Sequence, residues 1–200
     1  MAEVLKKSQA IHNFMENLLR EFQFDSSSKN DILAAYFDIV MEHHQSIILL
    51  INHNLNGSAS SLVRPLYEIY MRFLYVCTLD SKDDIQKIAT DKFRFPTIHD
   101  MTTAIDEAYD TRENFFENLK NNVWGTMNGY VHSGIHQLSR RFKDDLVQQN
   151  YSEEEKIEIL KSVNMQLMLM GIVFFKFLDD TSKAIEIEEY LDQYLAKEGL

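Results

Sequence analysis

The segment Ser60–Thr78, SSLVRPLYEIYMRFLYVCT, decides the fold of the 200-residue chain. Apolar residues recur along it in steps of three and four, which is the spacing of one side of a helix. One row contains Leu62, Leu66, Ile69, Phe73 and Val76, and a second row, one position further on, contains Val63, Tyr67, Tyr70, Leu74 and Cys77. A helix that is apolar around most of its circumference lies inside a domain. The segment therefore predicts a central, buried helix.

Three charged residues interrupt this apolar helix at regular spacing. Arg64, Glu68 and Arg72 stand four residues apart, so their side chains project from one stripe of the helix. An unpaired buried charge costs several kcal/mol, so a buried row of this kind must be ion-paired and hydrogen-bonded. Two arginines facing one carboxylate leave an excess of positive charge. The row is therefore either an internal ion-pair network or a site for an anionic ligand or for catalysis.

Composition favours a single helical domain. Hydrophobic residues make up 45% of the chain, which is enough to bury one substantial core, and no segment resembles a linker between domains. Only 6 glycines and 2 prolines interrupt long runs of residues that favour helices. We therefore predict one domain over residues 1–200 with an all-α fold, an antiparallel bundle of about seven to eight helices.

Helix-start and turn signals divide the chain into segments. The helices that we expect are Glu3–Phe24, Lys29–His53 with Ser28 as its N-cap, a third from Ser58–Ser61 to Thr78, Ser81–Phe93, Thr97–Tyr109, Glu113–Trp124, Ser152–Asp179 and Lys183–Ala196. Thr97 is the expected N-cap of its helix, and Ser152 with Glu155 forms a capping-box pattern. The turn Asn54–Gly57 predicts an antiparallel hairpin of the second and third helices. Pro65 lies past the expected start of the third helix, so it either occupies the first turn or kinks the helix.

Charge and cysteine content limit the function and location of the chain. The net charge of −11 argues against broad, non-specific attraction to nucleic acid, which needs a basic surface. Cys77 is the only cysteine, so no intrachain disulfide can form, and we expect a reducing, cytoplasmic location. The polar start of the chain lacks the apolar core of a signal peptide. The longest apolar run, Met165–Phe175, is shorter than the roughly 18–20 residues of a membrane span, so we expect a core helix and no membrane association.

A second informative segment, Trp124–Phe142, is rich in glycine and histidine. Glycine permits close approach of another helix or of a ligand, so this segment predicts a conformationally special site. His132 and His136 are four residues apart, and Arg140 continues the same face of the expected helix. We expect His132 to pack near the charged row, where it is either a structural hydrogen-bonding group or an acid–base group.

Metal binding is an alternative use of these histidines. His132 and His136 have a spacing that can share a metal ion, with His43, His44 or Glu42 as ligands from another helix. The sequence lacks the glutamate of a His-Glu-x-x-His motif at this place. We therefore predict no metal and no other cofactor, and we keep a metal-dependent helical hydrolase as an alternative.

A local basic patch ends the same segment, at Arg140, Arg141 and Lys143. Cations suit the negative C-terminal end of a helix dipole, which is a sufficient structural explanation for the patch. Contact with a phosphate group is the functional alternative. The chain contains no Gly-rich phosphate loop, no nucleophile elbow and no set of zinc-binding cysteines, so these enzyme classes are excluded.

Two segments together resemble a known group of proteins. Ser60–Val76, with Ser-x-x-x-Arg-Pro-x-x-Glu-x-x-x-Arg, and Asn128–Arg141, with Tyr-Val-His-Ser-Gly and Gln-Leu-x-Arg-Arg, are similar to uncharacterised bacterial helical proteins. Those proteins look related to the HEPN superfamily, to which several abortive-infection and toxin–antitoxin proteins of phage defence belong. The resemblance covers the middle part of the chain.

The resemblance implies an antiparallel helical bundle, commonly a homodimer, whose active members cut RNA without a metal at a polar site formed across the dimer. Glu68-x-x-x-Arg72 matches the Glu-x-x-x-Lys/Arg element of that family. The family's Arg-x4–6-His signature has no match before His132. Arg94 and His99 fit its spacing, but Pro96 lies between them and breaks a shared helix.

The function expected from this resemblance is that of a HEPN-like, defence-associated protein, either a metal-independent ribonuclease or a protein that handles RNA or a nucleotide. His132 would be the acid–base group, Arg64 and Arg72 would stabilise phosphate charge, and Glu68 would orient an arginine. The candidate contacts to the phosphate groups of the ligand are His136, Arg140 and Arg141. The alternative is a non-enzymatic interaction or antitoxin-type module with a protein partner, in which the charged row is structural.

Overall fold

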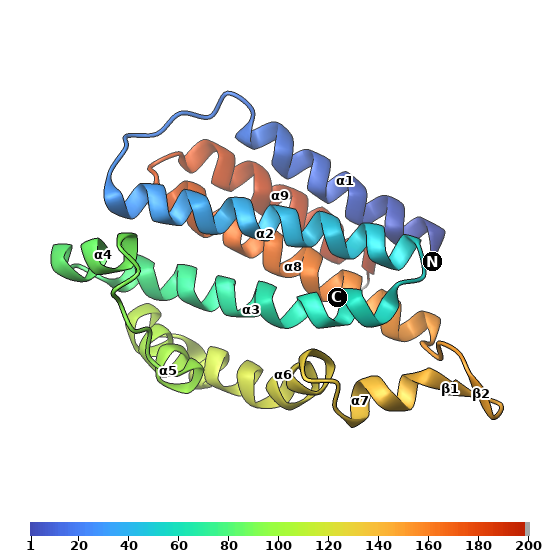
Figure 1. Cartoon of the computed structure of the whole chain (residues 1–200). Coiled ribbons are helices and arrows are strands. Elements are labelled where there is room, and N and C mark those ends of the chain that lie inside the picture. The colour runs from blue at the N-terminus through green and yellow to red at the C-terminus, as the bar shows by residue number, and fades with distance from the viewer. Residues whose placement is uncertain (199–200) are drawn as a thin grey trace.

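The structure is a computed structural model that describes residues 1–198, and it is almost entirely helical (Figure 1). Its α-helices are α1 (Ala2–Leu19), α2 (Ser28–Asn52), α3 (Asn56–Thr78), α4 (Lys82–Ala89), α5 (Ile98–Tyr109), α6 (Phe115–Val131), α7 (Ile135–Leu138), α8 (Glu153–Phe177) and α9 (Thr181–Glu198). The described part also contains two 3₁₀ turns, η1 (Arg112–Asn114) and η2 (Ser139–Arg141), and a small hairpin of β1 (Phe142–Lys143) and β2 (Leu146–Val147). The predicted all-α fold is confirmed, with nine α-helices in residues 1–198 rather than seven to eight.

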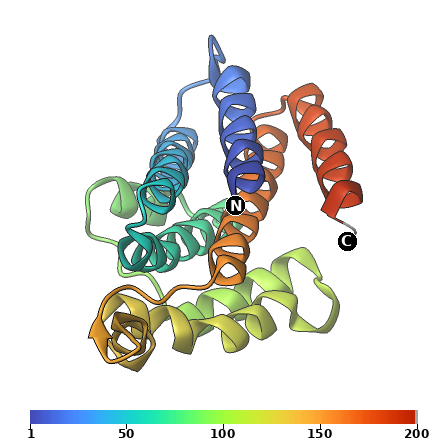
Figure 2. The same ribbon diagram turned by 90° about the vertical axis from the view of Figure 1, so that its right-hand side faces the viewer.

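Helix α3, which contains the apolar segment Ser60–Thr78, lies at the centre of the arrangement. It packs on α2 and α8 on one side and on α5 and α6 on the other, while α1 and α9 pack on α8. Figure 1 and Figure 2 show α5 and α6 together below α3, apart from the group formed by α1, α2, α8 and α9. α2 and α3 run antiparallel, as the turn between them predicts (Figure 1). Helix α3 therefore has close neighbours on both sides.

Aromatic side chains fill the core between α2 and α8. Phe37 of α2 and Phe174 of α8 stack with their ring centroids 4.6 Å apart, and Phe175 packs edge-on against Phe174. Phe22, in the loop after α1, packs edge-on against both residues of α8. Burying a side chain of this size stabilises the fold by about 1.5–3 kcal/mol. The cluster therefore fixes the loop after α1 as well as the two helices.

Helix α8 contains the longest apolar run. Among residues 1–198 it is the one helix long and apolar enough to cross a membrane, judged by length and composition alone. In the bundle, 44% of the most apolar window of this helix is buried. Leu167, Met168, Phe174 and Phe175 all lie in the core. The helix therefore packs as the core helix that the sequence predicts.

Local capping signals correctly predict two helix starts. Ser152 and Glu155 form the expected capping box at the start of α8. The side chain of Thr97 accepts a hydrogen bond from the backbone N–H of Asp100 at the start of α5. In both cases the partner lies three residues further on in the sequence, so the signal is local and does not depend on tertiary contacts.

The end of α1 and the start of α2 differ from the prediction. Helix α1 ends at Leu19 and not at Phe24, because Glu21 takes a left-handed backbone conformation with φ 64°. Helix α2 begins one residue earlier than expected, because the side chain of Ser27 rather than Ser28 accepts the capping hydrogen bond. The serine cluster offers several equivalent caps, so the sequence does not specify which serine is used.

Helix α3 begins at Asn56, earlier than the predicted start at Ser58–Ser61, so Pro65 lies in the helix interior. The helix continues through this position. Proline has no N–H, so the carbonyl of Ser61 lacks its usual partner in the helix. The hydroxyl of Ser61 shares its proton between the carbonyl of Gly57 at 2.9 Å and the carbonyl of Tyr130 at 3.1 Å. The second contact ties the N-terminal part of α3 to the end of α6.

Helix α6 continues past its predicted end at Trp124. It runs through Gly129, and the chain then turns at Ser133, whose φ is 53°. The ring of His136, after the turn, lies so close to the helix that a Cβ at Gly129 would be 2.6 Å from its Cδ2 atom. The glycine therefore permits the close approach that the sequence predicts, although the segment approaching it is the turn itself.

A buried polar cluster lies between α1, α2 and α8. Nε2 of His44 is 2.9 Å from Oδ1 of Asn164, whose Nδ2 donates to Ser8 Oγ at 2.9 Å. Nδ1 of His44 also lies 3.4 Å from Nδ1 of His12. Burial lowers the pKa of His44 from its ordinary value of 6.5 to about 4, against the opposing effect of the hydrogen bond to Asn164. His44 is therefore a neutral core residue at pH 7.

Candidate functional site

Arg64 joins two other candidate residues into one chain of contacts, which we call the Arg64 cluster. Nε of Arg64 donates to Oε1 of Glu68 at 2.8 Å, and Nη1 of Arg64 lies 2.9 Å from Nε2 of His132. Glu68 stands one turn further along α3, whereas His132 caps the C-terminal end of α6. The structure thus brings His132 to the charged row, as the sequence predicts.

Trp124 of α6 holds the guanidinium of Arg64 in place. Cζ of Arg64 lies 4.7 Å from the centre of the Trp124 ring. A cation over an aromatic face contributes about 0.5–1 kcal/mol at an exposed site. The bond to Glu68 and the contact with the ring together fix the plane of the guanidinium, and within residues 1–198 its Nη2 has no hydrogen-bond partner. This nitrogen is available to bind an anion.

The Arg64 cluster is open to solvent. The side chains of Arg64 and Glu68 are 20% and 29% exposed, and His132 is an exposed residue. Arginine donates hydrogen bonds and cannot accept them, so Nε2 of His132 accepts, and its neutral ring carries the proton on Nδ1. A ligand can therefore reach a carboxylate, a guanidinium and an imidazole that already contact one another.

Arg72 lies apart from the Arg64 cluster. Its guanidinium lies over the ring of Phe95, 5.1 Å from the centroid, and within residues 1–198 it forms no ion pair. Its Nε atom is buried without a hydrogen-bond partner. Of the two arginines that flank Glu68 on α3, Arg64 pairs with it, whereas the loop before α5 supplies an aromatic ring to Arg72.

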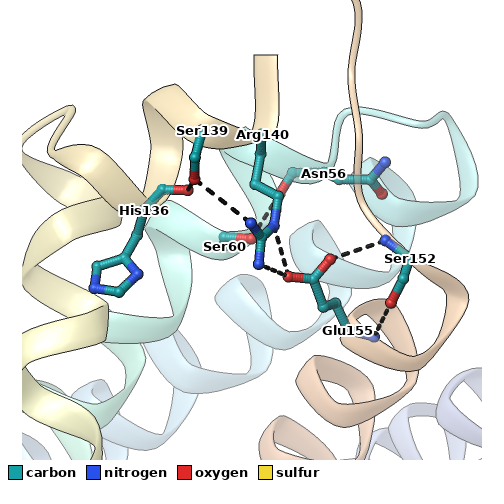
Figure 3. Close-up of polar contacts among 7 residues, drawn as sticks. All are labelled: Asn56, Ser60, His136, Ser139, Arg140, Ser152 and Glu155. Atoms are coloured by element: carbon teal, nitrogen blue, oxygen red, sulfur yellow. Dashed lines mark hydrogen bonds and ion pairs between the residues drawn. The ribbon is translucent and has the colours of Figure 1, made fainter. Parts of the chain in front are cut away.

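The predicted helix face shared by His132, His136 and Arg140 does not exist, because the turn at Ser133 separates the first residue from the other two. Nε of Arg140 donates to Oε1 of Glu155 at 2.7 Å (Figure 3). The His136 ring points away from this pair in Figure 3 and packs on α6. Arg140 is thus neutralised by a carboxylate of α8 and fastens η2 to that helix.

Arg141 lies over the first turn of α3. A Cβ at Gly57 would overlap one guanidinium nitrogen of Arg141 and would be 3.2 Å from the hydroxyl of Tyr151, which is buried without a hydrogen-bond partner. Within residues 1–198 Arg141 forms no ion pair. The positive end of the α3 dipole adds to its charge. Of the three candidate phosphate contacts, Arg141 is the one whose surroundings favour an anion.

The region that contains these residues also matches a protein family. Residues 37–196 match a family of unknown function, DUF6988. The chain belongs to DUF6988. No curated protein and no solved structure matches this chain. The matched region of this DUF6988 protein includes the whole Arg64 cluster and every candidate phosphate contact. Because the family description states no activity, the function must be inferred from the site itself.

The alternative metal site is not assembled in this DUF6988 protein. His44 lies in the buried polar cluster, whereas His132 contacts Arg64 and His136 packs on Gly129. In the part of the chain that the structure describes, no three His, Cys, Asp or Glu side chains are grouped closely enough to hold a metal ion. The ligand set of His132, His136 and a histidine of α2 is therefore wrong.

Two residues that shape these contacts, Trp124 and Glu155, are not among the candidate residues predicted from the sequence. Trp124 is the only tryptophan of the chain and begins the glycine-bearing segment, which is a signal that could have drawn attention to it. The capping-box pattern at the start of α8 accounts for an acid at position 155, so Glu155 does not stand out in the sequence as a candidate site residue. Its second role, as the partner of Arg140, has no separate signal in the sequence of this DUF6988 protein.

Replacing Glu155 with alanine is expected to lower the free energy of unfolding by about 1–2 kcal/mol. The change removes one half of the capping box and the partly exposed ion pair with Arg140. Urea unfolding of both proteins measures this difference. Glu158→Ala, an exposed position on the same helix, is the matched control and is expected to change the free energy by less than about 0.5 kcal/mol. Equal effects of the two changes would contradict the structural role of Glu155.

Proposed function

We propose that the protein is a HEPN-like, metal-independent ribonuclease that acts at the Arg64 cluster. The observation that carries the proposal is the contact of 2.9 Å between Nη1 of Arg64 and Nε2 of His132 on a partly exposed surface. It puts a phosphate-binding group beside an acid–base group. Cleavage of a phosphodiester bond requires both groups, because charge grows on the phosphate oxygens while a proton is moved.

In the proposed reaction the 2′-hydroxyl of RNA attacks the adjacent phosphorus and forms a 2′,3′-cyclic phosphate. The bond to the 5′-oxygen of the next nucleotide breaks, and this oxygen takes a proton from water as it leaves. A phosphate that binds both Nη1 and the free Nη2 of Arg64 competes with His132 for Nη1 and frees Nε2 to take the proton of the 2′-hydroxyl. The guanidinium, held by Glu68 and Trp124, stabilises the charge that grows on the phosphate. Because RNA supplies its own nucleophile, the reaction does not need a water bound to a metal.

The charge distribution limits how RNA binds in this proposal. The net charge of −11 makes most of the surface unfavourable for a polyanion. Arg64 and the position of Arg141 over Gly57 lie on the same side of α3, about 10 Å apart along the helix. We expect contact with few phosphates of a single strand between these two arginines, and therefore a modest dependence of binding on salt.

Incubating the purified protein with single-stranded RNA in EDTA tests the proposal. The wild-type protein is expected to cut the RNA, and Arg64→Ala is expected to slow cleavage about 100-fold, because the phosphate loses the guanidinium that stabilises its charge. Arg112→Ala, which removes an exposed arginine of η1, is the matched control and is expected to keep the wild-type rate. Intact RNA with the wild-type protein, or an unchanged rate with Arg64→Ala, would contradict the proposal.

One observation favours a second candidate function, a non-enzymatic interaction module. Residues 135–147 form an arm of α7, η2, β1 and β2 that exposes large apolar side chains. These are Ile135, Leu138, Phe142, Leu146 and Val147. Exposed apolar patches of this kind mark protein–protein interfaces. The arm would then bind a protein partner or a second copy of the chain, in keeping with the homodimer that the HEPN resemblance implies. Intact RNA together with a dimer that Val147→Glu dissociates would favour this function over the ribonuclease.

A cytoplasmic location and a role in phage defence complete the proposal. Burial raises the pKa of the Cys77 thiol to about 12, which suits a reduced, unreactive cysteine. The support for a defence role is the resemblance to abortive-infection and toxin–antitoxin proteins.

A further inference from the structure

A pocket of about 540 Å³ opens between α3, α6 and α8. Helices α6 and α8 each pack on α3 but hardly on each other, so the space between them is left unfilled. The volume lies within the range of about 300–1,000 Å³ typical of small-molecule sites. On α3, Val63 and Tyr67 line the pocket, while Arg64 and Glu68 follow one position later and project about 100° away. The pocket is therefore distinct from the Arg64 cluster.

The walls of this pocket are mainly apolar and aromatic. Each of the three helices presents a row of side chains at helical spacing. Prominent members are Val63, Tyr67 and Tyr70 of α3, Leu119 and Val123 of α6, and Ile159 of α8. A row of this kind on a helix of a globular protein is normally covered by another element, and here it faces the pocket. The walls therefore suit a ligand with an apolar body, and the tyrosine rings favour one that contains a ring.

Two polar oxygens in the walls have no hydrogen-bond partner in residues 1–198. They are the hydroxyl of Tyr67 and Oε1 of Gln166. The Nε2 of Gln166 donates to Ser162 Oγ at 3.1 Å, so Oε1 is the free end of this amide. Burial raises the pKa of Tyr67, so its hydroxyl stays protonated and can donate. An unpaired buried polar atom destabilises the protein, and a ligand group that reaches either atom removes part of this destabilisation.

The charge around the pocket disfavours an anionic ligand. Glu158 is the one charged side chain among the described residues that line it, and the whole chain carries a net charge of −11. A carboxylate or phosphate bound here would meet a like charge and no cation. An uncharged ligand is not repelled by Glu158 and needs no cation in the pocket.

We infer that this pocket binds a small, uncharged molecule with an apolar, ring-containing body and a hydroxyl group, such as a phenol or an alcohol. The apolar body of the ligand occupies the space between α6 and α8. The hydroxyl of the ligand accepts a hydrogen bond from the hydroxyl of Tyr67 or donates one to Oε1 of Gln166. The inference does not depend on the proposed ribonuclease activity, and its test uses no RNA.

Fluorescence of N-phenyl-1-naphthylamine, an uncharged dye that brightens in apolar surroundings, measures binding to the intact protein. The wild-type protein is expected to give a saturable signal with one dye per chain. Val63→Trp on α3 and Ser162→Trp on α8 each add a large side chain to the lining of the pocket, and each is expected to raise the dissociation constant of the dye at least tenfold. Glu189→Trp adds the same side chain at an exposed position of α9 and is the matched control, expected to leave binding unchanged.

Competition against the dye tests the chemical class of the ligand. The ratio of the dissociation constants of 2-naphthol and 2-methylnaphthalene reports the contribution of the ligand's hydroxyl group to binding. The two probes differ in hydration, but this difference is the same for the wild type and for Tyr67→Phe, so it cancels when their ratios are compared. Tyr67→Phe is expected to shift the ratio at least threefold against 2-naphthol without lowering the melting temperature, since the tyrosine hydroxyl has no partner to lose.

Three results would overturn the inference. The first is the absence of saturable dye binding, and the second is unchanged binding in both pocket-filling variants. The third is a loss of dye signal as protein concentration rises and a dimer forms, because the pocket would then be covered by a second copy of the chain.

Discussion

Replacing His132 with alanine is expected to slow RNA cleavage by about 100-fold to 10,000-fold, the usual contribution of a positioned acid–base group. The change removes the nitrogen that we propose takes the proton of the 2′-hydroxyl, but it leaves the guanidinium of Arg64 and its bond to Glu68 in place. His132 is exposed, so the melting temperature is expected to change by less than about 2 °C. Initial rates in EDTA and thermal unfolding of the same preparations measure both quantities.

His53→Ala is the matched control for this experiment. His53 is also an exposed histidine that caps the end of a helix, but it lies after α2 and does not contact the Arg64 cluster. The control is expected to cleave RNA at the wild-type rate. If both variants lost activity equally, or if the loss in His132→Ala followed a large fall in melting temperature, His132 would be a structural residue.

The second large effect is a loss of stability at acidic pH, which arises at the buried His44. Its pKa is about 4 in the folded protein and 6.5 in the ordinary state expected of the unfolded chain. Between these values the unfolded chain binds a proton that the folded protein does not, so stability is complete above pH 6.5 and falls as the pH decreases toward 4. The difference between the two pKa values corresponds to about 3 kcal/mol in the free energy of unfolding.

Urea unfolding at pH 7.5 and at pH 5 measures this effect. His44→Gln is expected to remove most of the difference between the two pH values, and the remainder arises at His12, whose pKa burial also lowers. His53→Gln, at the exposed histidine, is expected to keep the full difference. The change in overall charge on acidification is nearly the same in all three proteins. A full pH difference in His44→Gln would show that another group is responsible.

The sequence predicts those parts of the fold that depend on local chemistry. The apolar spacing of Ser60–Thr78 indicates a core helix, and α3 indeed packs on neighbours from both sides. The caps at Thr97 and Ser152 are correct because each cap bonds to a residue three positions away. The end of α6 is predicted wrongly, because the turn at Ser133 depends on contacts between α6 and the segment that follows it.

The site is predicted less completely, because spacing on one helix does not decide which neighbours a long side chain meets. Arg64 and Arg72 are equally placed to pair with Glu68 on α3. In the structure Arg64 contacts the ring of Trp124 of α6, and Arg72 contacts the ring of Phe95 in the loop before α5. Glu68 forms its ion pair with Arg64. These rings are distant in sequence from the residues that they contact. The pocket beside Tyr67 is likewise a product of how three helices are spaced.

The central claim is that Arg64 and His132 act together on one phosphate. Rates of RNA cleavage in EDTA by the wild type, Arg64→Ala, His132→Ala and the double variant test this claim most directly. Residues that act as a unit give losses that do not multiply. The wild type is therefore expected to cut RNA, and the double variant is expected to be within about threefold of the slower single variant. Losses that multiply in the double variant, or a wild-type protein that leaves the RNA intact, would contradict the claim.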